Sequence, residues 1–378
     1  MTRTYLDHNA TSPTRPEVNQ AVNEALNVSG NPSAQHKDGR AANAIISKAR
    51  EAVGLAMGVR AQDIIFTSGG TEGDNTAIYS ALKSGCKRLF ISSMDHPATI
   101  LAAEAFTPAF GAAIEIIPAD DQGRTNINWL KAQLENWEAS HGRPFVSIVA
   151  ANSETGVVQD IEAASELVRR VNGLILVDAV QALGKISMTF QPDYLTVSAH
   201  KVGGPKGVGA LYVSPDAPYA SLLVGGGQER RRRAGTMNVA GIAGFGAAVK
   251  AMGDLSQTKA LRDTFENGLK PLEPHLTIFG EDVERLPNTS LFAVPDAASQ
   301  TLMMALDLEG ISVSTGTACS SGKVGASRAI TAMGLSERAP KGVIRVSFGY
   351  NSTERDVEKF HAAWSKIRKN RTKMRGAA

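Results

Sequence analysis

The chain lacks the features that place a protein in a membrane, in a disulfide framework or on nucleic acid. Its 378 residues include only two cysteines, Cys86 and Cys319, which are too few for a disulfide framework and lack the spacing of metal ligands. No run of 18 apolar residues occurs, and residues 1–7 contain no apolar signal core. The formal net charge is only +3. We therefore expect a cytoplasmic protein that neither enters a membrane nor binds nucleic acid.

The chain does contain the periodicity of a large α/β protein. Hydrophobic residues make up 43% of it, and its length suggests two domains. Short apolar runs alternate with stretches such as 41–58, whose apolar residues recur at helical spacing. This alternation predicts a mostly parallel sheet covered by helices. The seven expected strands cover residues 63–67, 88–93, 113–118, 145–151, 174–178, 194–199 and 208–214.

The pattern changes after about Gly253. Helical and strand-like stretches are mixed there, and the proline-containing segments 286–288 and 294–296 interrupt them. We therefore predict a large domain over residues 15–252 and a smaller α+β domain in residues 253–378.

The most informative residues are Asp178 and Lys201. Asp178 ends the apolar run 174–178, and Lys201 follows the next predicted strand 23 residues later. In parallel sheets, ligands bind at the carboxyl ends of strands. Either residue alone has an ordinary explanation, as a turn cap or a surface charge. Together they can hold pyridoxal phosphate, because its aldehyde bonds to a lysine amine and its ring nitrogen needs a carboxylate.

A phosphate site is expected where residues 67–75 form a strand, a glycine turn and a helix start. Such a turn aims backbone N–H groups and the positive end of a helix dipole at an anion. The same pattern is also typical of an ordinary turn and helix cap. Ser198, His200 and Thr236 add further donors for one phosphate monoester.

Two other side chains have chemistry that the site could use. His96 follows a predicted strand at the same sheet edge as Asp178, where an imidazole can stack on a ring and relay protons. A lone histidine at a strand end is otherwise most often structural. Cys319 lies in a run of small residues, 312–322, which predicts an exposed loop and an activatable thiol. Cys86 has no such setting.

Basic residues gather in two places. Residues 230–233 are four arginines beside a glycine run, and the C-terminal tail from Lys366 to Arg375 is dense in Lys and Arg. Both clusters can be solvated surface charge. The first could instead meet an anionic ligand or a partner subunit, and the second an acidic partner protein.

These motifs closely resemble the pyridoxal-phosphate cysteine desulfurases of the nitrogen-fixation and iron–sulfur assembly type. Those enzymes form part of the class V aminotransferase-like family of fold type I. The resemblance covers nearly the whole chain. The matching positions are 5–11, 31–33, 36, 39–40, 67–75, 154–156, 178–181, 198–207, 233–236, Cys319 and Arg345.

The resemblance implies a role for each site residue. Lys201 would bond to the cofactor aldehyde, Asp178 would contact the ring nitrogen, and His96 would stack on the ring. Gln181 would lie near the phenolic oxygen. The phosphate ligands would be Gly70, Thr71, Ser198, His200 and, from a neighbouring subunit, Thr236. Asn152 and Arg345 would bind the substrate, a task for which the forked guanidinium suits its carboxylate. Cys319 would attack the substrate sulfur and carry it as a persulfide.

One position departs from the family pattern. Members often have a second asparagine where this chain has Ser153, so that Ser153 either takes over a contact to the phenolic oxygen or leaves that contact weaker.

The implied protein is a homodimer that converts L-cysteine to L-alanine and passes sulfur to an acceptor or iron–sulfur scaffold protein. Its small domain would include residues 1–14 and the Cys319 loop. A selenocysteine lyase or an aminotransferase of the same fold, and a non-catalytic sulfur-transfer scaffold, are the alternatives.

Overall fold

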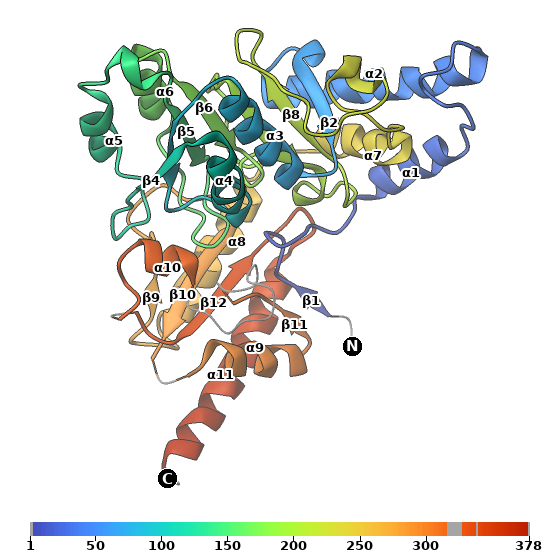
Figure 1. Cartoon of the computed structure of the whole chain (residues 1–378). Helices are drawn as coiled ribbons and strands as arrows, with labels where there is room; N and C mark the ends of the chain where they lie inside the picture. The colour runs from blue at the N-terminus through green and yellow to red at the C-terminus, as the bar shows by residue number, and fades with distance from the viewer. Residues whose placement is uncertain (1–2, 296, 316–326, 338, 377–378) are drawn as a thin grey trace.

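The computed structural model describes residues 3–295, 297–315, 327–337 and 339–376 (Figure 1). Its largest sheet has seven strands in the order β2-β8-β7-β6-β5-β3-β4. Along the chain these are β2 Ile64–Thr67, β3 Arg88–Ser92, β4 Ala113–Ile117, β5 Phe145–Val149, β6 Leu174–Asp178, β7 Tyr194–Ser198 and β8 Gly209–Val213. Each lies within a predicted run. The predicted seven-stranded, mostly parallel sheet is therefore confirmed, with β8 antiparallel to both of its neighbours.

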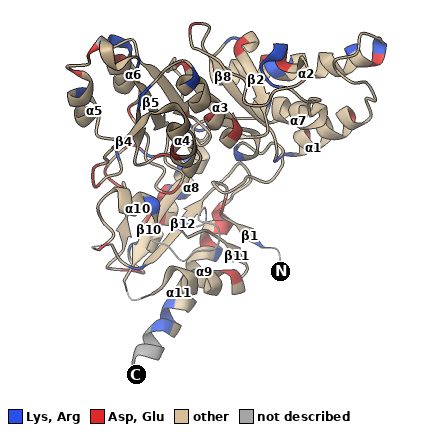
Figure 2. Ribbon diagram, in the orientation of Figure 1, with Lys and Arg blue, Asp and Glu red and all other residues tan. Residues whose placement is uncertain are grey.

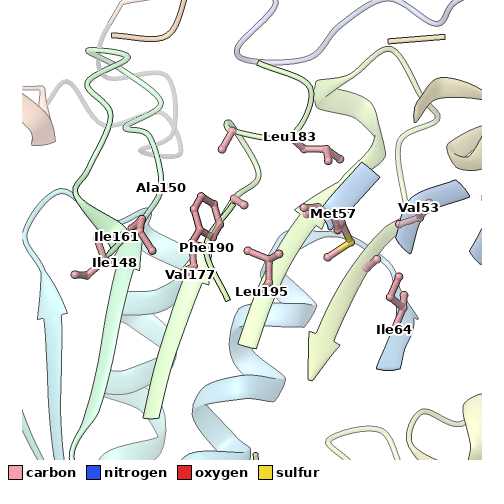
Figure 3. Close-up of a cluster of buried hydrophobic side chains, with 14 of the residues drawn as sticks. Val53, Met57, Ile64, Ile148, Ala150, Ile161, Val177, Leu183, Phe190 and Leu195 are labelled. Atoms are coloured by element: carbon pink, nitrogen blue, oxygen red, sulfur yellow. The ribbon is translucent and has the colours of Figure 1, made fainter. Parts of the chain in front are cut away.

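Helices cover both faces of this sheet because alternate strand residues point to opposite sides. Side chains of α3 and α4 pack on the face formed by residues such as Ile91 and Leu176. Side chains of α2, α5, α6 and α7 pack on the other face, part of which Figure 3 shows. The bounds are α2 Lys37–Met57, α3 Gly70–Lys83, α4 Pro97–Phe110, α5 Ile127–Leu134, α6 Ile161–Arg170 and α7 Val239–Lys250, with α1 Pro16–Leu26 packed against α7.

A second body with its own core lies below the large sheet in Figure 1. An antiparallel sheet of order β12-β10-β9 forms its centre, and β1 pairs with β11 beside it. Fully buried Phe265, Phe292 and Trp364 meet in its core. The elements are β1 Thr4–Tyr5, α8 Ser256–Leu269, β9 Thr277–Ile278, β10 Thr289–Val294, α9 Ser299–Leu308, β11 Ile311–Ser312, α10 Arg328–Ala332, β12 Gly342–Ser347 and α11 Glu354–Gly376.

The N-terminal segment connects the two bodies. Leu6 is buried in the core of the second body, whereas the backbone N–H of Ser12 donates to the carbonyl of His200 at the large sheet. Residues 7–11 therefore cross from one body to the other. The domain boundaries at 14/15 and 252/253 stay a prediction.

Within the described part of the chain, no helix combines the length and apolar character that crossing a bilayer requires.

Candidate active site

A pocket of about 470 Å³ opens at the carboxyl ends of the parallel strands, where the second body faces the large sheet. Most of the residues that the sequence singled out line it. They are Gly70, Thr71, His96, Asn152, Ser153, Asp178, Gln181, Ser198, His200, Lys201 and Arg345. The topology thus brings together residues up to 275 positions apart in the chain.

Two predicted site residues are not among these. Thr236 is exposed and does not line the pocket of its own chain. Cys319 falls outside the described residues, between Thr315 and Ser327. Both assignments remain predictions.

Asp178 is a buried acid at the tip of β6. Only 4% of its surface is exposed, and one carboxylate oxygen accepts a hydrogen bond from the Val180 N–H at 2.9 Å. Burial raises its pKa, and nearby His96 and Lys201 oppose that rise. Among the described residues it takes part in no ion pair. A cation in the pocket would therefore stabilise its charged form.

Two further buried carboxyls surround Asp178. Asp74 accepts a hydrogen bond from the Thr196 hydroxyl at 2.6 Å, and Asp95 accepts one from the Val149 N–H at 2.6 Å. Burial raises both pKa values, that of Asp95 to about 7, and Asp178 adds to each rise. This end of the pocket therefore favours a positively charged ligand group.

Lys201 reaches the pocket from a 3₁₀ turn, Ala199–Lys201, that follows β7. Its Nζ atom donates to the backbone carbonyls of Asn9 at 2.5 Å and Ala10 at 3.0 Å. The N-terminal segment thus holds the amine that the sequence predicted to bond to the cofactor.

His96 begins α4 as its N-cap. Its Nδ1 atom accepts a hydrogen bond from the Ala98 N–H at 3.1 Å, so the proton of the neutral ring lies on Nε2. Burial lowers the pKa of His96, and Lys201 lowers it further against the opposing effect of Asp178. A neutral ring of fixed tautomer therefore faces the pocket.

The expected phosphate cradle is the first turn of α3, which begins at Gly70, and its role stays a prediction. A Cβ atom on Gly70 would lie 2.5 Å from the Val180 side chain, so that only glycine fits there. The free N–H groups of this turn and the Ser198 hydroxyl can donate to an anion. Burial, followed by Lys201, lowers the pKa of His200 to about 4, which makes it neutral at pH 7.

An ion pair ties the loop that carries Thr236 to the same helix. Arg233 Nε lies 2.9 Å from Glu72 Oε1, and Glu72 also accepts a hydrogen bond from the Ser68 N–H at 2.8 Å. The Thr236 loop is therefore fixed beside the cradle of its own chain while Thr236 itself remains exposed.

Arg345, on β12, lines the pocket from the second body, as does Arg328 at the start of α10. Arg345 is 3% exposed and donates to Asp7 Oδ1 at 2.7 Å and to the Ser153 carbonyl at 2.9 Å. Its Nε atom has no hydrogen-bond partner among the described residues. A buried N–H without a partner is costly, so a ligand carboxylate here would satisfy it.

Asn152 has a structural role that the sequence did not indicate. Its Oδ1 atom accepts from the N–H groups of Glu154 and Thr155, and its Nδ2 atom donates to the Met94 carbonyl. One amide hydrogen remains for a ligand. Its assignment to substrate binding stays a prediction.

Sequence reasoning did not single out several residues that line the pocket. Asn9, Asp74 and Asp95 stand inside or beside motifs already noted, but no pattern distinguished them from surface polar residues. Glu154, whose pKa burial raises, accepts a hydrogen bond from the Ser327 hydroxyl. Its position in the Glu-Thr-Gly motif was the available signal.

The residues present fit pyridoxal phosphate. The carboxyl cluster around Asp178 suits a protonated ring nitrogen, Lys201 provides an amine, and the first turn of α3 suits a phosphate. These groups share one pocket, and each chemical part of the cofactor has a matching partner there.

Comparison with known proteins defines the class. The family model described as aminotransferase class-V matches residues 4–360, and the chain belongs to that family. Its members use pyridoxal phosphate, which is the cofactor of this protein.

Individual relatives are similar over nearly the full chain. A cysteine desulfurase of Cereibacter sphaeroides is 39% identical over 95% of this chain and 94% of its own length. A cysteine desulfurase of Sinorhizobium fredii is 35% identical over 98% and 99%. The structure of a NifS-like protein from Rickettsia africae superposes with a TM-score of 0.87 at 33% identity, covering 97% of this chain and 99% of that one.

Proposed function

We propose that the protein is a cysteine desulfurase, in which L-cysteine and the Cys319 thiol yield L-alanine and a Cys319 persulfide. The observation that carries this proposal is that one pocket contains Lys201, Asp178 and Arg345. The Nε atom of Arg345 has no hydrogen-bond partner among the described residues. Relatives of that name, similar over nearly the full chain, support it.

Each part of the pocket has a task in that reaction. When bound, pyridoxal phosphate draws electrons from the substrate Cα. Asp178 would hold a proton on the ring nitrogen, and the first turn of α3 would hold the phosphate. Arg345 Nε binds the substrate carboxylate, which orients the Cα proton toward the Lys201 amine. Lys201 is thus the general base.

The sulfur step balances without an external oxidant. The Cys319 thiolate attacks the substrate sulfur, an S–S bond forms and the substrate Cβ–S bond breaks. The electron pair of the broken bond stays with the three-carbon product, which gains protons and leaves as alanine. The neutral Nε2-protonated ring of His96 can deliver one of those protons.

We further propose a cytoplasmic homodimer that passes sulfur to an acceptor or scaffold protein for iron–sulfur assembly. The exposed Thr236 beside the cradle supports a site completed by a neighbouring subunit. Lys and Arg lie along the described part of α11 that extends from the second body, which suits an acidic partner (Figure 2). Residues 15–252 would form the large domain, with 1–14 and 253–378 forming the small one.

The two cysteines provide a matched test. Replacement C319A should leave the cofactor bound, as its visible absorbance reports, and should abolish sulfide release from L-cysteine. Replacement C86A should retain that activity, because Cys86 is buried in the core beside α3 and its pKa is raised by burial. Sulfide release by C319A at the wild-type rate would refute the proposal.

A further inference from the structure

Lys185 is a cation beside the pocket that the proposed reaction does not use. It is half-buried, and its Nζ atom donates to Gln181 Oε1 at 2.8 Å and to Asn9 Oδ1 at 3.2 Å. Among the described residues it is in no ion pair. Burial lowers its pKa to about 7, and the charges of Lys201 and Arg345 contribute. A lysine in this setting costs stability, so its contacts call for a functional explanation.

Both acceptors of Lys185 are side-chain amides, whose two ends differ chemically. The Gln181 Nε2 atom donates to the Asn9 carbonyl at 2.9 Å, and that carbonyl also accepts from Lys201. An amide nitrogen has two hydrogens, so Gln181, which lines the pocket, retains a second N–H. The orientation of this amide decides whether the pocket receives a donor or an acceptor.

The ammonium form of Lys185 constrains that orientation. An ammonium group only donates, whereas the lone pair of a neutral amine could also accept an N–H. The charged form therefore requires the Gln181 oxygen to face Lys185, at the observed 2.8 Å, which turns the NH₂ group away from Lys185. Asn9 is fixed in the same way, with Nδ2 donating to Thr289 Oγ1 at 2.8 Å.

We infer that Lys185 is a positioning residue that holds the Gln181 amide with its NH₂ group toward the phenolic oxygen of the cofactor. This inference rests on the cofactor placement proposed above. A donor at that oxygen would lower its basicity, and the proton shared between the oxygen and the Nζ atom of cofactor-bonded Lys201 would then be lost at a lower pH. Loss of the donor should move this titration upward by about one pH unit.

The test is the visible absorbance of the holoenzyme against pH in five variants. K185M and Q181A should each raise the midpoint, and the double variant should shift no further than Q181A alone. K185R, which still donates to both amides, should return the midpoint toward the wild-type value. K206M, which removes an exposed lysine of the Lys201 segment, should leave it unchanged.

Each contrary outcome has a distinct meaning. If K185M raises the midpoint by the same amount in the Q181A background as in the wild type, the inference is overturned, because Lys185 would then act through its charge alone. A Q181A shift without a K185M shift would overturn it too, while sparing the cofactor placement. An unmoved Q181A midpoint would reject both. If K185M fails to fold, K185Q, whose amide imposes no orientation on Gln181, tests the same prediction.

Discussion

Two walls of the pocket are built in different ways. The cofactor wall, formed by the first turn of α3 with His96, Asp178, Ser198, His200 and Lys201, comes from strand tips and helix starts of one sheet. The substrate wall, formed by Asn9, Ser153 and Arg345, comes from three distant segments joined by hydrogen bonds, and Arg345 also donates to Asp7. A sheet fixes the first wall, whereas the second depends on how the two bodies meet.

The largest effect is expected from breaking the cofactor wall at Asp178. Replacement D178N keeps the shape but removes the negative charge that we propose holds the ring nitrogen protonated, so kcat should fall by about a thousandfold. The KM for cysteine should change little, because Arg345 belongs to the other wall. Steady-state kinetics with a cofactor-absorbance check measures this. A kcat within tenfold of wild type would argue against the role of Asp178.

A change in the substrate wall should alter the KM for cysteine, whereas a change in the cofactor wall should alter kcat. Replacement R345K keeps the charge but loses the fork that reaches Asp7 and Ser153 while leaving Nε for a substrate carboxylate. The KM for cysteine should rise about 10- to 100-fold. The affinity for pyridoxal phosphate, measured by titration of the cofactor-free protein, should stay the same. Weaker cofactor binding with an unchanged KM would show that the walls are not separable.

The N-terminal segment that joins the two walls should influence how the stability of the protein depends on pH. His8 is buried where a Cβ on Gly349 would clash with its ring, and burial, followed by Lys185, lowers its pKa to about 4. Between pH 6.5 and about 4 the unfolded chain binds a proton that native His8 does not. Stability should therefore fall as pH falls through this window, by at most about 1.4 kcal/mol per pH unit for this group.

Replacement H8N should flatten that dependence, since it removes the titrating group but keeps a polar partner for Ser12. Urea unfolding at a series of pH values would show this. If the free energy of unfolding depends on pH with the same slope in H8N and wild type, His8 does not contribute to the pH dependence of stability.

The smallest effect is expected outside both walls. Residues 229–231 have positive φ angles of 46°, 57° and 65°, although none is glycine. The bidentate pair between Arg50 and Glu229 holds this turn. Replacement R231G should relieve local strain and stabilise the protein by up to about 1 kcal/mol, without altering kinetics. Thermal unfolding measures it, and a loss of stability would show that the Arg231 side chain contributes more than its backbone costs.

The same contrast explains what the sequence could predict. The seven strands were found because each is a short apolar run, and Asp178 and Lys201 because they follow such runs. The antiparallel direction of β8 left no trace in its apolar pattern. The sequence does not predict that Asn9 links the two bodies, because its hydrogen-bond partners Thr289 and Ser153 lie far along the chain. Contacts between bodies are set by tertiary packing, which local periodicity does not encode.

The most direct test of the account is the stoichiometry of one reaction cycle. The holoenzyme is mixed with L-cysteine without reductant or sulfur acceptor, and alanine and sulfur on each cysteine are measured by mass spectrometry. We expect one alanine for each persulfide formed, with the sulfur on Cys319 and none on Cys86. Repeated release of alanine while Cys319 remains an unmodified thiol would contradict the account.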